Sequence, residues 1–146
     1  MTQYWQTISE SPRWKSWSGY TFETICFKHA QLIKNALGIS GVITKEASWE
    51  YISEKNNTAE TGAQIDLLFD RNDNVISICE MKCYAGKFSI SKKYAEELRN
   101  KINIFREKAS PTKSIFLVMV TVEGVKKNSY SMEIVNNEVT LKNFFA

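Results

Sequence analysis

The stretch AQIDLLFDRNDNVISICEMK, residues 63–82, decides the fold of this chain because it predicts a β-hairpin. Two apolar runs, Ile65–Phe69 and Val75–Cys79, flank the polar segment Asp70–Asn74. Apolar runs of this length on either side of a turn-forming segment are typical of two antiparallel strands. The remainder of the chain is expected to pack around this hairpin.

Charged side chains stand at the open end of the predicted hairpin. Asp66 lies near the start of the first apolar run, and Glu80 and Lys82 end the second. Because residues two apart on a strand share a face, Glu80 and Lys82 project together, on the face that Ile76 and Ile78 would use for the core. If Asp66 pairs near Glu80, two carboxylates and one ammonium meet at one place.

Such a group of charges predicts a site for a divalent cation. Mg²⁺ prefers oxygen ligands, so Asp66, Glu80 and the backbone carbonyl of Met81 are candidate ligands for Mg²⁺ or Mn²⁺. Lys82 beside the metal would orient an attacking water and stabilise charge that develops on a phosphate. The alternative is a hairpin end whose charges are solvated or pair with one another, and the residues alone leave both open.

Length and composition predict one globular domain. A chain of 146 residues, 43% hydrophobic and 24% charged, is long enough to bury a core. No run approaches the ~20 apolar residues of a membrane span, and no signal peptide opens the chain. We therefore expect a cytoplasmic protein with no membrane partner. The formal net charge of +3 permits a nucleic-acid partner without requiring one.

The three cysteines, Cys26, Cys79 and Cys83, lack the CxxC spacing of a zinc site. They are expected to be buried or free thiols in a reducing compartment.

A helix is predicted over residues 19–37, ending at Gly38, because Phe22, Ile25 and Ile33 share one face. Glu23 lies in its first turn, where a carboxylate suits the helix dipole. Its apolar neighbours would also draw it toward the interior, where a water-mediated metal contact becomes available. His29, the only histidine, is interpreted as a surface residue and not as a general base.

Two short strands are expected between this helix and the hairpin, one over Gly41–Glu46 and one around Trp49 and Tyr51. The polar tract over residues 53–61 predicts a loop.

After the hairpin, Ser91–Lys108 predicts a second helix with an apolar stripe at near-helical spacing. Its charged side, which includes Lys101, is expected to face solvent. Lys87, Lys92 and Lys93 closely follow the Glu80–Lys82 strand and are candidate phosphate contacts. Ordinary solvated lysines are the alternative.

The run Ser114–Val122 predicts a strand buried on both faces, as in the middle of a mixed sheet covered by helices. The tail predicts a small hairpin, with strands around Glu133–Val135 and Val139–Leu141 joined at Asn136–Asn137. Together these elements predict an α/β sandwich around a mixed central sheet.

The N-terminal residues 1–17 carry Trp5, Trp14 and Trp17 and show no sustained period. They are interpreted as an arm laid over a domain that spans residues 18–146, or as a linker to something upstream.

The order of Glu23, Asp66 and Glu80-x-Lys82, followed by a helix and a buried strand, resembles the PD-(D/E)xK superfamily of restriction-endonuclease-like nucleases. Thirteen residues separate Asp66 from Glu80, and Ile65 replaces the proline of the family motif. The segments WKSWSGYTFETICFKH, GAQIDLLFD, ICEMK and SIFLVMVTVEG resemble the C-terminal nuclease-like domain of prokaryotic AAA-type ATPases. The resemblance runs from about Trp14 to the end.

The resemblance implies a restriction-endonuclease-like α/β/α sandwich and Mg²⁺-dependent hydrolysis of phosphodiester bonds, with DNA favoured over RNA. Asp66 and Glu80 would bind the metal, Lys82 would position the water, and Glu23 would hold a metal-bound water or a second ion. Gln64 is a candidate ligand contact or a polar edge residue.

The resemblance also implies an ATPase core in the same or a longer chain. This sequence itself has no phosphate-binding G-x-x-x-x-G-K-[ST] loop, so it is not expected to hydrolyse ATP. A homodimer is a further expectation. Two other classes stay open: a domain that binds nucleic acid or the ATPase without cutting, and an interaction module whose hairpin charges only pair.

Overall fold

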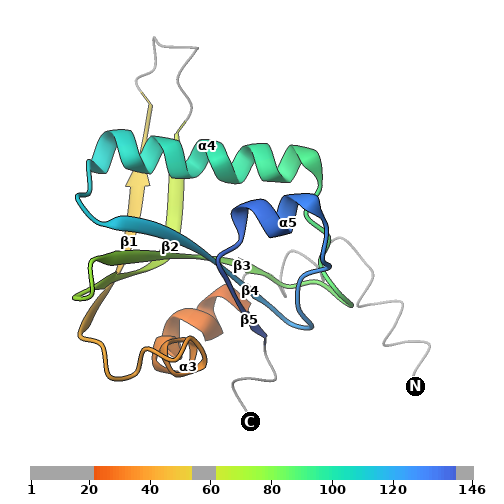
Figure 1. Cartoon of the computed structure of the whole chain (residues 1–146), viewed down its shortest axis with the longest axis horizontal. Helices are drawn as coiled ribbons and strands as arrows, with labels where there is room; N and C mark the ends of the chain where they lie inside the picture. The colour runs from red at the N-terminus through yellow and green to blue at the C-terminus, as the bar shows by residue number, and fades with distance from the viewer. Residues whose placement is uncertain (1–21, 54–61, 141–146) are drawn as a thin grey trace.

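The predicted hairpin forms the middle of a five-stranded mixed sheet with helices on both faces (Figure 1). The computed structural model describes residues 22–53 and 62–140. The strands lie in the order β1-β2-β3-β4-β5, which is also their order along the chain. Their bounds are β1 Thr44–Tyr51, β2 Ala63–Arg71, β3 Val75–Lys82, β4 Ser114–Thr121 and β5 Asn137–Thr140. The helices are α3 Ala30–Ala36, α4 Lys92–Ala109 and α5 Ser129–Ile134, and residues 22–28 are also helical.

The hairpin prediction is confirmed, with strands longer than the two apolar runs. β2 and β3 pair antiparallel from Asp70↔Ile76 to Leu67↔Cys79. Asn74 in the turn adopts a φ of 68°, a left-handed conformation that asparagine tolerates better than most residues.

The second half of the sheet is parallel, because α4 connects β3 to β4 and α5 connects β4 to β5. The predicted strand Ser114–Val122 is confirmed as β4, and its residues 117–121 are buried. The small C-terminal hairpin is wrong, since residues 133 and 134 end helix α5 and β5 runs parallel to β4. Asn128 and Ser131 form a capping box that starts α5, and a parallel connection needs such a crossover.

The first helical region is less regular than predicted. Residues 22–28 are helical, a turn occupies His29, and α3 follows; residues 19–21 lie outside the described range. Gly38 has a φ of +74° and ends α3 as predicted, because only glycine adopts this conformation at no steric cost.

The two short strands expected before the hairpin are a single strand, β1. It pairs with β2 along its length, with an irregularity between Ala47 and Trp49. The extra residue at that irregularity belongs to β2, and β1 itself is continuous.

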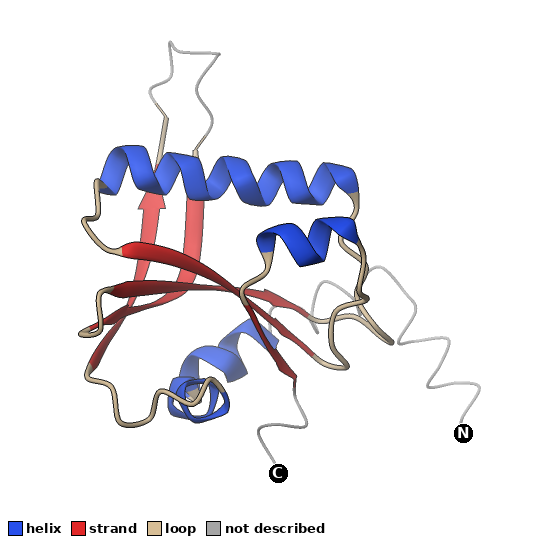
Figure 2. Cartoon of the chain, in the orientation of Figure 1, coloured by secondary structure: helices blue, strands red, loops and turns tan. Residues whose placement is uncertain are grey.

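Two hydrophobic cores fill the layers on either side of the sheet (Figure 2). One core packs the first helical region against the sheet; it contains Phe22, Cys26, Ala30, Ile33, Leu67, Phe69, Cys79, Met81, Val118, Val120 and Val139. The other packs α4 on the opposite face; it contains Ile65, Leu68, Ile76, Ile78, Ile90, Ala95, Leu98, Phe105, Leu117, Met119 and Val125. The expectation of a mixed sheet between helical layers is confirmed.

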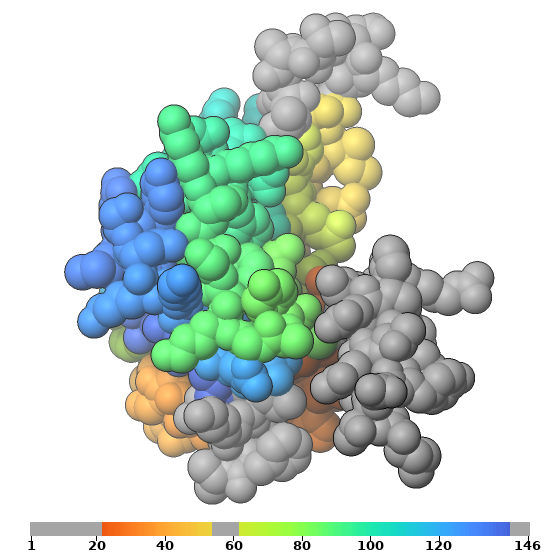
Figure 3. Space-filling model, turned by 90° about the vertical axis from the view of Figure 1, so that its right-hand side faces the viewer, coloured from red at the N-terminus to blue at the C-terminus, as the bar shows by residue number. Residues whose placement is uncertain are grey.

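Figure 3 shows the loop after β3, in green, lying against the blue segment that follows β4. An isolated bridge between Phe88 and Val125 joins these two segments. Within residues 22–53 and 62–140, no helix is long and apolar enough to cross a membrane. The predicted N-terminal arm, residues 1–17, lies outside the described residues.

Candidate functional site

The hairpin opens at the end opposite its turn. The β2–β3 ladder ends at Leu67↔Cys79, one step before Asp66 and Glu80 would face each other. β3 continues to pair with β4 on its other side as far as Lys82↔Thr121. Asp66 and Glu80 therefore flank the point where two neighbouring strands separate.

A bulge in β2 turns Asp66 away from the position that simple alternation predicts. Trp49 pairs with Ile65 and Ala47 pairs with Leu68, so one β1 residue stands opposite Asp66 and Leu67. An extra residue of this kind re-aims a side chain and ends regular pairing. Asp66 and Glu80 therefore do not form a direct ladder pair, although the charge of Asp66 still raises the pKa of Glu80.

Asp66 faces the first helical region. It lines a shallow depression of about 380 Å³ together with Glu23, Ser48 and Gln64. Gln64 Nε2 donates a hydrogen bond of 2.9 Å to Asp66 Oδ1, which confirms that Gln64 lies beside Asp66.

The charges of Asp66, Glu80 and Lys82 all influence the pKa of Glu23. Burial raises its pKa most, and the negative charges of Asp66 and Glu80 raise it further, while Lys82 and Lys101 lower it. The predicted residues Glu23, Asp66, Glu80 and Lys82 thus share one electrostatic environment, although they come from a helix and two strands. We call these four residues the acidic cluster.

Glu80 points toward α4, where it meets a residue that the sequence placed on a solvated face. Lys101 Nζ lies 2.7 Å from Glu80 Oε1, and the Glu80 side chain is only 12% exposed. Burial raises the pKa of Glu80 in spite of this ion pair. The sequence did contain a signal for Lys101, because it follows Leu98 by three residues and precedes Phe105 by four, which places it beside the apolar stripe.

Lys82 lies on the same side of the sheet. Its Nζ stands 4.9 Å from the centroid of the Tyr94 ring, near the start of α4. The Tyr94 hydroxyl is buried and, among the residues described, has no hydrogen-bond partner. A buried unpaired hydroxyl is costly, so a bound water or ligand at this place would gain a donor and an acceptor.

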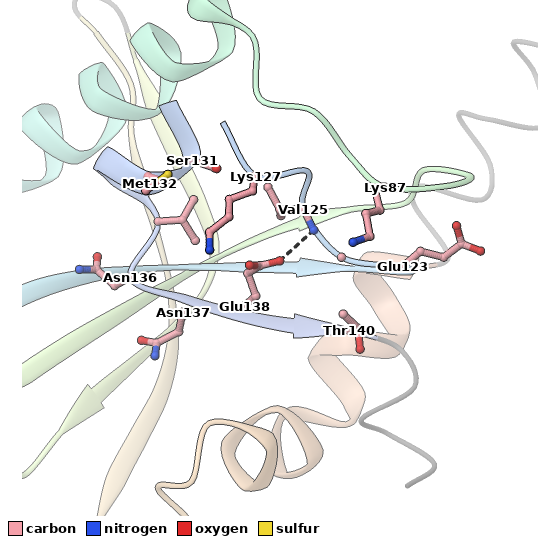
Figure 4. Close-up of a pocket in the computed structure, with 12 residues that line it drawn as sticks. Lys87, Glu123, Val125, Lys127, Ser131, Met132, Asn136, Asn137, Glu138 and Thr140 are labelled. Carbon is pink, nitrogen blue, oxygen red and sulfur yellow. Dashed lines mark hydrogen bonds between the residues drawn. The ribbon is translucent and has the colours of Figure 1, made fainter. Parts of the chain in front are cut away.

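The predicted phosphate-contacting lysines do not form one group. Lys92 and Lys93 are exposed in the first turn of α4, immediately before Tyr94. Lys87 instead lines a separate cavity of about 540 Å³ between α5 and β5, together with Glu123, Lys127 and Glu138 (Figure 4). The presence of two carboxylates among its lining residues makes that cavity a mixed-charge one.

The donor atoms of the acidic cluster suit Mg²⁺ or Mn²⁺. Carboxylates such as those of Glu23, Asp66 and Glu80, and backbone carbonyls such as that of Met81, are the hard oxygen ligands that these ions prefer. Among the described residues, the Tyr94 hydroxyl next to Lys82 is also buried without a hydrogen-bond partner. In the part of the chain that the structure describes, however, no three His, Cys, Asp or Glu side chains are already arranged around one point. The residue types fit the metal, and their side chains are engaged elsewhere: Glu80 by Lys101 and Asp66 by Gln64.

Comparisons with protein-family models, with curated proteins and with solved structures found no match to this chain.

Proposed function

We propose that this chain is a metal-dependent nuclease domain that hydrolyses phosphodiester bonds in nucleic acid, with DNA favoured over RNA. One observation carries the proposal: Asp66, Glu80 and Lys82 lie where β2 and β3 separate, and the charges of all three act on Glu23 in the neighbouring helix. Partly buried carboxyls with raised pKa values, here Glu23 and Glu80, are typical of functional sites.

The residues would divide the work as follows. Asp66 and Glu80, with the Met81 carbonyl, would hold Mg²⁺, and Glu23 would hold a metal-bound water or a second ion. The bound metal would supply an activated water and neutralise charge on the phosphate. The Lys82 ammonium would orient that water and stabilise negative charge as it grows on the phosphate oxygens.

The finer fold belongs to the same proposal. A helix, an antiparallel hairpin, a crossover helix and a parallel strand occur here in the order expected of a restriction-endonuclease-like α/β/α sandwich. The resemblance to the C-terminal domain of AAA-type ATPases extends the proposal to an ATPase core as partner, a cytoplasmic location and a homodimer.

The test compares two aspartates of one strand. Wild type, Asp66→Asn and Asp70→Asn are titrated with Mn²⁺ and are assayed on plasmid and on single-stranded DNA in Mg²⁺. Asp70 is the matched control, because its carboxylate binds Lys113 at the turn end of the hairpin. We expect saturable metal binding and cleavage in wild type and Asp70→Asn, and loss of both in Asp66→Asn. Absence of metal binding to wild type at millimolar concentration would contradict the proposal.

A second candidate is a domain that binds nucleic acid or the ATPase without cutting. The ion pair of Glu80 with Lys101 favours it, because this pair engages the central carboxylate of the acidic cluster. Metal binding by wild type without cleavage of either substrate would select this candidate.

A further inference from the structure

Glu80 and Lys101 meet in the layer between β3 and α4. Their side chains are 12% and 28% exposed, and the Nζ–Oε1 distance is 2.7 Å. Ala95, Leu98 and Phe105 anchor α4 in the core on this face of the sheet. Lys101 is therefore held in place by a helix that is packed on the sheet, unlike a lysine on a fully exposed surface.

The same helix holds the other end of the Glu80-x-Lys82 segment. Tyr94 precedes Lys101 by seven residues, two helical turns, so both side chains lie on one side of α4. The Tyr94 ring lies beneath the Lys82 ammonium, and Lys101 binds the Glu80 carboxylate. α4 thus contacts both charged residues of the segment that would carry the chemistry.

We propose that Lys101 is a positioning residue that neutralises Glu80 in the metal-free protein and competes with the divalent cation for that carboxylate. The inference rests on the proposed metal site. An ammonium within hydrogen-bonding distance of a carboxylate repels a divalent ion on the same group, and low exposure to water strengthens that repulsion. Lys101 binds one oxygen of Glu80, and a cation on this carboxylate would weaken or displace that contact, which would couple occupancy of the site to the packing of β3 against α4.

This competition distinguishes the Glu80–Lys101 ion pair from one that only stabilises the fold. Removing the ammonium takes away the ion-pair partner of the partly buried Glu80 carboxylate, which destabilises the metal-free protein. The same carboxylate then becomes a better cation ligand. Stability without metal and affinity for metal are expected to change in opposite senses.

The experiment measures Mn²⁺ binding by calorimetry and thermal unfolding in excess chelator, with the full chain and no nucleic acid. The variants are Lys101→Met, which keeps most of the side-chain volume, and Lys101→Arg, which keeps the charge. Arg106→Met is the matched control, because Arg106 is an exposed cation of the same helix. We expect Lys101→Met to bind Mn²⁺ about tenfold more tightly than wild type and to unfold at a lower temperature in chelator. Lys101→Arg and Arg106→Met should bind Mn²⁺ as wild type does.

The outcomes separate this inference from the proposed function. Wild-type metal binding with unchanged or weaker affinity in Lys101→Met overturns the competition and leaves the metal site standing. Weaker affinity in that variant would mean that Lys101 orients Glu80 for the metal. If neither wild type nor Lys101→Met binds Mn²⁺, the metal site itself is wrong and the inference falls with it. If Lys101→Met does not fold, Lys101→Gln takes its place in the same comparison.

Discussion

The two ends of the β2–β3 hairpin carry similar numbers of charges but differ in how these charges are paired. At the turn end, the carboxylates of Asp70 and Asp73 are matched by Lys113 and Arg71, each in an ion pair. At the open end, Glu80 pairs with Lys101, while no ion pair is found for Glu23 or Asp66 among the described residues. The carboxylates are matched one to one at the turn end and are not so matched at the open end.

The pKa values differ in the same way. At the turn end, the hydrogen bonds from the Arg71 guanidinium lower the pKa of Asp73. At the open end, burial and neighbouring carboxylates raise the pKa of Glu23, and burial raises that of Glu80. Opposite charges that form ion pairs stabilise the folded protein. Carboxylates that are buried or lie near one another, as in a site for a cation, are less stable in their charged form. The comparison separates structural charges from candidate functional ones within one hairpin.

The largest expected effect is on cleavage. Under the proposed nuclease function, Lys82→Met should reduce DNA cleavage by about 10²-fold or more, because it removes the ammonium proposed to stabilise charge on the phosphate. Lys113→Met, which removes the cation of the Asp70 pair at the turn end, should leave the cleavage rate unchanged. Single-turnover rates on plasmid DNA give the measurement. Equal losses of cleavage rate in the two variants would mean that the two ends of the hairpin do not differ in function.

The next effect is on stability and belongs to the turn end. Arg71 donates to the Asp73 carboxylate and, over 3.1 Å, to the Ser77 hydroxyl, which is almost fully buried. Arg71→Ala should lower the free energy of unfolding by about 1–2 kcal/mol, because a buried hydroxyl loses its partner. Urea unfolding measures this loss. Mn²⁺ affinity should not change, and a change would show that the two ends are coupled.

A smaller effect tests the turn backbone. Asn74→Val should destabilise the protein by about 1 kcal/mol, since a β-branched residue is strained at a φ of 68°. Asn74→Gly is the control, because glycine reaches this conformation without strain. Thermal unfolding of the two variants gives the difference. Equal midpoints would mean that the turn relaxes to accept a side chain.

The smallest effect concerns Glu23 and depends on pH. The pKa of Glu23 is higher in the folded protein than in the unfolded chain, so the protonated carboxyl favours the folded state. This contribution to stability is lost as the pH rises through the folded-state pKa. Glu23→Gln should therefore raise the melting temperature at pH 7 on the order of 1 °C, a small shift because solvent screens a partly exposed group. The gain should vanish below about pH 4, where the wild-type carboxyl is also neutral. A variant less stable than wild type at pH 7 would show that Glu23 makes a favourable charged contact.

The cysteines agree with the expectation of buried or free thiols. Cys26 and Cys79 are buried and Cys83 is exposed, and all three are free. Burial raises the pKa of Cys26 to about 12, so its thiol is unreactive in the folded protein.

Several elements were predictable because their signals are local. The hairpin follows from two apolar runs around a polar turn, and β4 follows from a continuous apolar run. α4 follows from its apolar stripe and from Ser91, whose side chain caps the helix. α5 was missed because six residues are too few for a helical period to stand out, and its capping box is a subtler signal.

The amino-acid sequence by itself determined which charged residues stand among apolar neighbours in a helix and two strands, and therefore that Glu23, Asp66, Glu80 and Lys82 were candidates for one site. Only the tertiary structure decided how they are arranged. The bulge in β2 turns Asp66 toward Glu23, and the packing of α4 brings Lys101 to Glu80 across 21 positions of sequence. Both depend on how strands and helices pair over long distances in the chain, and such contacts leave no period in the sequence.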